Sequence, residues 1–241
     1  MPRPRTSQLA AGLLILAVLL GWAILSRSAA PRQPVGLFTS LPILWGEGEG
    51  LAQALARDRP PHPVATALNR IGPVQPLDTL EQLQPGLGQL VIAQPRPLSP
   101  TENVALDTWV RGGGHLLLFA DPLLTAHSAF AVGDPRRPQD VVLLSPILTR
   151  WGLELTFAED QPEGLRVVPG PGPAIPVNLR GGWRASAEGC QVEAEGLVAT
   201  CRIGRGHVVA VADAEVLTDA DPDAIRGPAL AALLRRAFAN H

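Results

Sequence analysis

Residues 90–122 read LVIAQPRPLSPTENVALDTWVRGGGHLLLFADP, with two apolar runs on either side of an amphipathic one. Ser99 is a good helix N-cap, Pro100 fits the first turn, and Glu102 completes a capping box. The glycines at 112–114 end the helix, because glycine adopts the left-handed conformation that a helix C-terminus favours. A strand, a helix and a strand in this order predict a βαβ crossover, in which the two strands are parallel.

The flanking sequence supplies further elements of the same kind. We expect strands at 35–40, 89–93, 115–120, 153–157 and 207–212, and helices at 47–57, 64–71, 99–111, 141–151 and 228–239. The strands at 115–120 and 207–212 are apolar throughout, which is typical of parallel strands covered on both faces. The prediction is an α/β fold with a mostly parallel sheet and helices on both faces. Trp45 and Trp183 are expected in loops.

Two segments are expected to leave this pattern. Residues 158–176 are rich in proline and glycine, so they lack the donors of a central strand and are expected to cross over or to extend from the sheet. Residues 190–201 predict a β-hairpin with a tight turn at Glu195-Gly196. This register places Cys190 opposite Cys201 on one apolar face, so a disulfide is possible in an exported domain. A reduced, buried pair is the alternative.

The N-terminus carries a long uncharged segment. Leu9 to Leu25 contains no charged residue and would span about 25 Å as a helix, close to the thickness of a bilayer's hydrocarbon core. The main interpretation is a single uncleaved membrane anchor. The alternatives are a cleaved signal peptide and, with less support, a buried core helix. The first two interpretations give an N-terminal segment of residues 1–30 and an exported domain of residues 31–241.

Composition excludes several classes of protein. The 20 basic residues are all arginine and stand against 22 acidic residues, so the net charge of −2 gives no sign of nucleic-acid binding. The chain has no GxxxxGK[ST] loop and no lysine, so it contains no ATP-binding cassette of its own. None of the five histidines lies at metal-binding spacing, and two cysteines are too few for a structural zinc site. No metal or cofactor is therefore expected.

Asp121 and Asp213 are the candidate ligand-binding residues. Each follows a predicted buried strand, and open α/β sheets bind ligands at the carboxyl ends of their strands. If the two strands are neighbours, both carboxylates face one crevice and are able to hold a cation or a cationic group. The alternative is that each carboxylate caps the turn that follows its strand by accepting backbone N–H groups.

Two motifs resemble those of a known family. Residues 106–122 pass from a helix through Gly112-Gly113 to a strand and Asp121-Pro122, and residues 204–217 pass from a glycine turn through a strand to Asp213. Both are similar to motifs of the GldG-like auxiliary proteins of ABC-type transport systems and of the related DUF4350 proteins. The resemblance implies a flavodoxin-like fold, similar to class I glutamine amidotransferases, on a membrane-anchored and non-catalytic protein.

The resemblance also suggests where a catalytic residue would lie. An amidotransferase needs a cysteine in the sharp turn after a buried strand. The turns after residues 93 and 120 hold Gln94-Pro95 and Asp121-Pro122, and neither contains Cys or Ser. No catalytic residue is expected.

The expected function is that of a non-enzymatic accessory or assembly domain of an ABC-type transport system. The protein would lie in a bacterial inner membrane as a single-pass protein, with residues 9–25 in the membrane and the soluble domain in the periplasm. Its partners would be an ABC permease and an ATPase. The alternatives are a small-molecule sensor domain and an exported hydrolase that uses Asp121 and Asp213 as a carboxylate pair.

Overall fold

The computed structural model describes residues 32–45, 47, 60–170, 172–218 and 223–239. The chain divides into two units, residues 1–32 and residues 33–241. The expected membrane segment at 9–25 lies outside the described residues, as does the helix expected at 47–57 apart from its first residue. Within the described part of the chain, no helix is both long enough and apolar enough to cross a bilayer.

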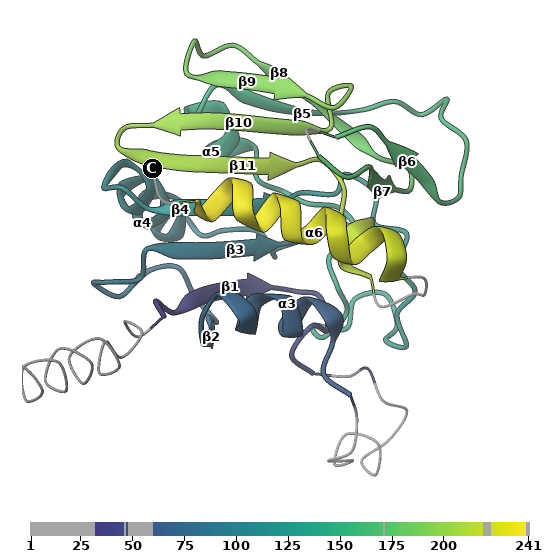
Figure 1. Cartoon of the computed structure of the whole chain (residues 1–241), viewed down its shortest axis with the longest axis horizontal. Coiled ribbons are helices and arrows are strands. Elements are labelled where there is room, and N and C mark those ends of the chain that lie inside the picture. The colour runs from purple at the N-terminus through teal and green to yellow at the C-terminus, as the bar shows by residue number, and fades with distance from the viewer. Residues whose placement is uncertain (1–31, 46, 48–59, 171, 219–222, 240–241) are drawn as a thin grey trace, which may run out of the picture. The chain divides into compact units, whose positions relative to one another are not determined.

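The centre of the second unit is a seven-stranded sheet (Figure 1). In spatial order its strands are β2 (Val74–Pro76), β1 (Val35–Thr39), β3 (Gln89–Ala93), β4 (His115–Phe119), β11 (Gly206–Val211), β10 (Val198–Ile203) and β9 (Cys190–Glu193). The first five pair in parallel and the last two are antiparallel. The five parallel strands have the order 2-1-3-4-5 along the chain, which is the order of flavodoxin-type doubly wound sheets.

Helices cover both faces of this sheet. α3 (Pro63–Ile71) and α6 (Asp223–Phe238) contact each other on one face, and α4 (Pro100–Arg111) and α5 (Ser145–Arg150) contact each other on the opposite face (Figure 1). Strands β3, β4 and β11 are therefore buried on both sides, and Leu90, Leu116 and Val209 are fully inaccessible to solvent. The predicted mostly parallel sheet with helices on both faces is confirmed.

The βαβ unit at 89–119 follows the sequence pattern closely. The Ser99 side chain accepts the Glu102 N–H, and the Glu102 side chain accepts the Ser99 N–H, so the capping box is complete. Helix α4 ends at glycines, and Gly113 has a φ of 115° that favours glycine. Gly206, at the start of β11, lets the end of α4 pack directly on that strand, since a Cβ there would lie 1.9 Å from the Val110 carbonyl oxygen.

The predicted hairpin forms, with Val192 opposite Ala199 and Cys190 opposite Cys201. Ala194 and Glu195, together with Gly196, have positive φ and make the tight turn. The structure has a disulfide between Cys190 and Cys201, whose Cα atoms lie 4.1 Å apart. The bridge joins β9, at the edge of the sheet, to the buried strand β10.

Two small sheets lie outside the central one. β5 (Leu153–Phe157) pairs antiparallel with β8 (Gly181–Ala185), and β6 (Arg166–Val168) pairs antiparallel with β7 (Ile175–Val177). The segment 158–176 thus extends from the central sheet, as its proline content predicts. The placement of Trp183 in a loop was wrong, because Trp183 is a buried residue of β8 that lies opposite Leu155.

Two helix boundaries differ from the prediction. The helix expected at 141–151 begins only at Ser145, because the Val142 N–H is bonded to the Asp121 carbonyl and not to a preceding turn. The helix expected at 228–239 begins earlier, at Asp223. Pro228 lies inside this helix, past the first turn, and has no N–H to donate to the preceding turn. The rule that proline starts a helix placed that boundary too late.

We expect the disulfide to contribute measurably to stability. Replacing both Cys190 and Cys201 with alanine should lower the free energy of unfolding by about 2–3 kcal/mol, because the bridge closes a short loop in the unfolded chain. Urea denaturation of the purified chain measures this difference. With a reducing agent present, wild type and variant should unfold at nearly the same urea concentration. An unchanged gap between them under reducing conditions would contradict the disulfide's role.

Candidate functional site

Four polar side chains lie at the carboxyl edge of the parallel sheet. Ser40 follows β1, Gln94 follows β3, Asp121 follows β4, and Asp213 follows β11. In the pairing of β4 with β11, Phe119 lies opposite Val211, so the two aspartates end neighbouring strands at the same level. The structure therefore brings together the two candidate residues of the sequence analysis and adds Ser40 and Gln94 to them.

Asp121 ties the ends of two strands together. Its Oδ1 accepts the Leu123 N–H at 2.9 Å, and its Oδ2 accepts the Ala214 N–H at 3.2 Å. The first bond caps the turn after β4, and the second reaches across to the turn after β11. With 2% of its surface exposed, Asp121 is closed off from solvent.

Asp213 has the same kind of environment. Its Oδ1 accepts the Glu215 N–H at 2.6 Å, and its Oδ2 accepts the Asn178 N–H at 3.0 Å. The bond to Asn178 holds the segment before β8 over the end of β11, and the Gly181 N–H donates to the Ala212 carbonyl beside it. Every carboxylate oxygen of the pair thus accepts a backbone N–H, which is the geometry of the capping alternative.

Burial changes the acidity of both groups. Desolvation is the main cause that raises the pKa of Asp121 to about 6. Desolvation, followed by the charge of Asp121, raises the pKa of Asp213 to about 8. Two adjacent carboxyl groups out of contact with water disfavour double ionisation, so the pair retains a proton to a higher pH than isolated aspartates do.

Gln94 occupies the sharp turn after β3. Its φ of 43° is in the left-handed region, and its side chain is fully buried. The amide nitrogen donates to the Asp121 and Gln139 carbonyls at 3.0 and 2.8 Å, and the amide oxygen accepts the Asp121 N–H at 2.9 Å. Gln94 therefore joins β3 to the end of β4 and to the loop that covers this edge.

Ser40 extends the same network to β1. Its hydroxyl donates to the Gln94 carbonyl at 2.5 Å and accepts the Gln139 N–H at 3.0 Å. The loop at Gln139 is thus held by Ser40 and by Gln94 at once. The carboxyl edge over β1, β3 and β4 is closed by backbone and amide contacts.

A cavity of about 240 Å³ lies beside this network, at the ends of β1 and β3. The strand order reverses between these two strands, and doubly wound sheets bind ligands at such switch points. The cavity is lined by Phe38, Ser40, Trp45, Arg96, Arg136 and Gln139, among others. Trp45 is 46% exposed, so an aromatic surface is available at its rim.

The two arginines of the cavity are already engaged. Arg96 forms a two-pronged ion pair with Glu102, with both distances at 2.8 Å, and its guanidinium lies 5.0 Å from the Phe38 ring centroid. Hydrogen bonding to Arg96 is the main cause that lowers the pKa of Glu102 to about 2. Arg136 pairs with Asp134 and lies over the Phe130 ring. A ligand in this cavity would meet arginines that already have carboxylate partners.

Sequence reasoning missed Gln94, Ser40 and Arg96. Their roles depend on contacts with residues far along the chain. A Gln-Pro pair after a buried strand gives no sequence signal that the glutamine amide will hydrogen-bond to other loops. In the described part of the chain, no three His, Cys, Asp or Glu side chains form a group able to hold a metal ion. The pair of aspartates has too few open ligands for a cation site, because its oxygens face backbone donors.

Comparison with known proteins gives one family and several distant folds. A family model described as "Domain of unknown function (DUF4350)" matches residues 50–233. No curated protein matches the sequence.

Solved structures with a related arrangement include three proteins. The exo-β-1,4-mannosidase Op5Man5 from Opitutaceae bacterium strain TAV5 is 15% identical, with a TM-score of 0.47 over 87% of this chain and 34% of its own. A β-galactosidase from Rahnella sp. R3 is 14% identical, with a TM-score of 0.48 over 91% of this chain and 33% of its own. The chain thus spans about a third of the length of each glycosidase. A putative ThuA-like protein from Bacteroides uniformis is 10% identical, with a TM-score of 0.47 over 88% of this chain and 92% of its own.

Substitutions at Gln94 test the hydrogen bonds that its side chain forms at the carboxyl edge of the sheet. Gln94→Ala should lower the free energy of unfolding by about 2–4 kcal/mol, because it leaves the Asp121 N–H without its acceptor. Gln94→Gly loses the same amide but relieves the left-handed backbone, so it should be about 1 kcal/mol more stable than the alanine variant. Chemical denaturation of both variants measures the difference. Equal stability of the two would contradict the strained turn.

The aspartate pair should make stability depend on pH. Folding raises both pKa values, so the folded chain binds more protons than the unfolded chain between about pH 4 and pH 8. The free energy of unfolding should therefore fall as pH rises through this window. Asp213→Asn should flatten the slope, as measured by denaturation at several pH values from 5 to 8. Asp160→Asn, in an exposed loop, is the matched control and should keep the wild-type slope. Identical slopes in Asp213→Asn and wild type would contradict the proposed protonation.

Proposed function

The chain belongs to the DUF4350 family, and we propose that it acts as a membrane-anchored, non-enzymatic assembly domain of an ABC-type transport system. In this proposal residues 9–25 hold the protein in a bacterial inner membrane, and the α/β domain lies on the periplasmic side. Its partners are the permease and the ATPase of the transporter. In this proposal the domain shares the fold of class I glutamine amidotransferases but does not catalyse their reaction.

The observation that carries the proposal is the closure of the carboxyl edge. This edge is where a doubly wound sheet places its reactive groups. Here Asp121 and Asp213 accept backbone N–H groups with all four oxygens, and each is at most 2% exposed. The sharp turn after β3, where a nucleophile would stand in an amidotransferase, holds Gln94 with its amide bonded on both sides. In this proposal these polar groups stabilise the loops at the ends of the strands and take no part in catalysis.

Exposed apolar side chains surround this closed edge and support a docking role. Leu44 and Trp45 are 41% and 46% exposed in the loop after β1, and Val132 is 84% exposed in the loop after β4. Leu165 and Val167 are about half exposed in the segment that extends from the sheet. Contiguous exposed apolar patches often mark protein-binding surfaces, and in this proposal these loops together form the contact with the partners.

The switch-point cavity favours a second candidate function, a sensor of small molecules. Its position between the ends of β1 and β3 is the ordinary ligand site of such sheets. Its volume of about 240 Å³ is below the usual range for ligand pockets, so it would suit only a small compound. The carboxylate-pair hydrolase has less support, because a catalytic pair needs access to substrate and water.

Affinity purification of the full chain from membranes tests the proposal. An assembly domain should bring down a permease and an ATPase together, and Trp45→Ala with Leu44→Ser should weaken their recovery. Asp121→Asn with Asp213→Asn should leave recovery unchanged in a folded protein. Val104→Ser, which alters an exposed apolar residue on α4, is the control for the loop variant.

Three results would contradict the proposal. The first is recovery of the chain without any transporter component. The second is a reporter fused after His241 that proves to be cytoplasmic. The third is loss of a measurable hydrolytic turnover in the double Asn variant, which would favour the enzyme.

A further inference from the structure

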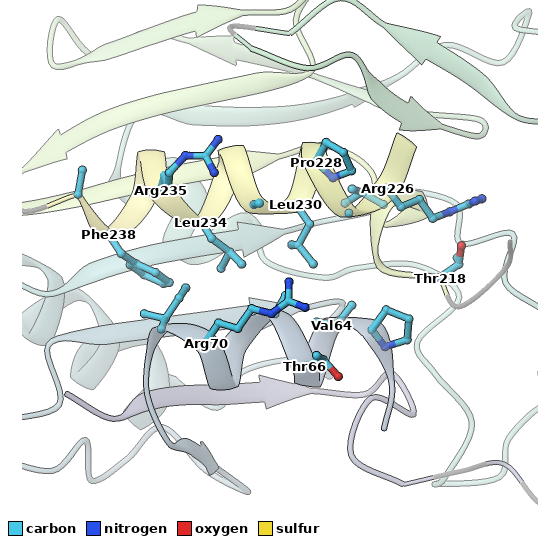
Figure 2. Close-up of a pocket in the computed structure, with 17 residues that line it drawn as sticks. Val64, Thr66, Arg70, Thr218, Arg226, Pro228, Leu230, Leu234, Arg235 and Phe238 are labelled. Carbon is cyan, nitrogen blue, oxygen red and sulfur yellow. The ribbon is translucent and has the colours of Figure 1, made fainter. Parts of the chain in front are cut away.

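A second and larger cavity lies between α3 and α6, on one face of the sheet (Figure 2). Its volume is about 880 Å³, which is in the range of binding sites for small organic ligands. Apolar side chains from both helices form its walls. They include Val64, Ala67 and Ile71 from α3 and Leu230, Leu234 and Phe238 from α6. We call this cavity the α3–α6 groove.

The shape of the groove favours a slender ligand. The two helices contact each other, and several apolar side chains at the base of the groove are buried. Val64, Leu234 and Phe238 are 2%, 3% and 8% exposed. An extended alkyl chain is narrow enough to lie along the walls, and its burial would be favourable.

The charged side chains around the groove favour a ligand with a negative charge. Its lining contains three arginines and no aspartate or glutamate. Arg226 forms an ion pair with Glu215. Arg70 is exposed and has no hydrogen-bond or ion-pair partner among the described residues. In Figure 2 its side chain extends from α3 into the space between the helices, whereas Arg235 points away from α3.

We propose that the α3–α6 groove binds a long-chain fatty acid, with the alkyl chain between the helices and the carboxylate on the Arg70 guanidinium. A guanidinium presents parallel N–H donors that match the two oxygens of a carboxylate. The apolar walls supply most of the affinity, and Arg70 supplies the preference for an acid. This site is independent of the proposed role in transport, since the expected contacts of the alkyl chain and the carboxylate are on α3 and α6.

The test uses the full chain in phosphatidylcholine nanodiscs and a C16 fatty acid that carries a photoactivatable diazirine in its chain. After irradiation, peptide mapping should place the label on Pro63–Ile71 and on the part of α6 from Leu230 to Phe238. The methyl ester of the same probe removes the charge and should label these peptides about fivefold less, as expected for loss of a partly exposed charge-assisted hydrogen bond. Arg70→Gln should reduce labelling by the acid to the level of the ester.

Matched variants separate the groove from general membrane association. Ala67→Phe fills the groove and should abolish labelling, whereas Ala105→Phe adds the same volume on α4 and should not. Arg184→Gln, at an exposed position of strand β8, is the charge control. Circular dichroism and thermal unfolding show that each variant is folded, and competition by unlabelled palmitate provides a test that needs no variant.

Several outcomes would overturn the proposal. Equal labelling by acid and ester would remove the role of Arg70. Labelling spread over all surfaces, or unaffected by both Ala67→Phe and palmitate, would remove the groove. Cross-links between two copies of the chain across α3 and α6, without labelling by the acid, would show instead that the groove is an interface for self-association.

Discussion

The structure depends on a single constraint, which is that the ends of its parallel strands must be closed without water. β1, β3, β4 and β11 end side by side, and polar side chains at their ends hydrogen-bond to the loops that follow. Asp121 meets this constraint for two strands at once, because it accepts one N–H from its own turn and another from Ala214 in the turn after β11. Gln94 does the same for β3 and β4 with an amide. A buried backbone donor without a partner costs about 1–3 kcal/mol, and these side chains supply the missing acceptors.

This constraint also decides how the aspartates should be understood. A buried carboxyl with a raised pKa is often a sign of catalysis, since active sites adjust acidity by burial. Here the same burial accompanies complete occupation of the oxygens by backbone donors. The raised pKa of Asp213 is therefore the cost of closing the sheet edge with two neighbouring carboxyl groups. Access to substrate and water, and not the pKa alone, distinguishes a catalytic carboxylate from a structural one.

Local patterns allowed much of the fold to be predicted, and long-range contacts set the remainder. The capping box at Ser99 and the register of Cys190 with Cys201 depend on residues a few positions apart, so the sequence alone specifies them. The late start of α5 depends on a bond from Val142 to Asp121, which no local pattern contains. The meeting of Asp121 and Asp213 was predictable only as a consequence of adjacent strands. Gln94 was not predictable, because its role exists only once the loop at Gln139 folds over it.

The carboxyl edge and the α3–α6 groove differ in the groups that they leave available to a ligand. At the edge, every polar group of the aspartate pair has a partner within the protein, so little is left for a ligand to gain. In the groove, apolar walls enclose a large volume and Arg70 is exposed without a partner among the described residues. Binding energy comes from groups that the folded chain leaves unsatisfied. On this reasoning the proposed fatty-acid site lies on the face of the sheet, because the aspartate pair at its edge has no unsatisfied oxygen to offer a ligand.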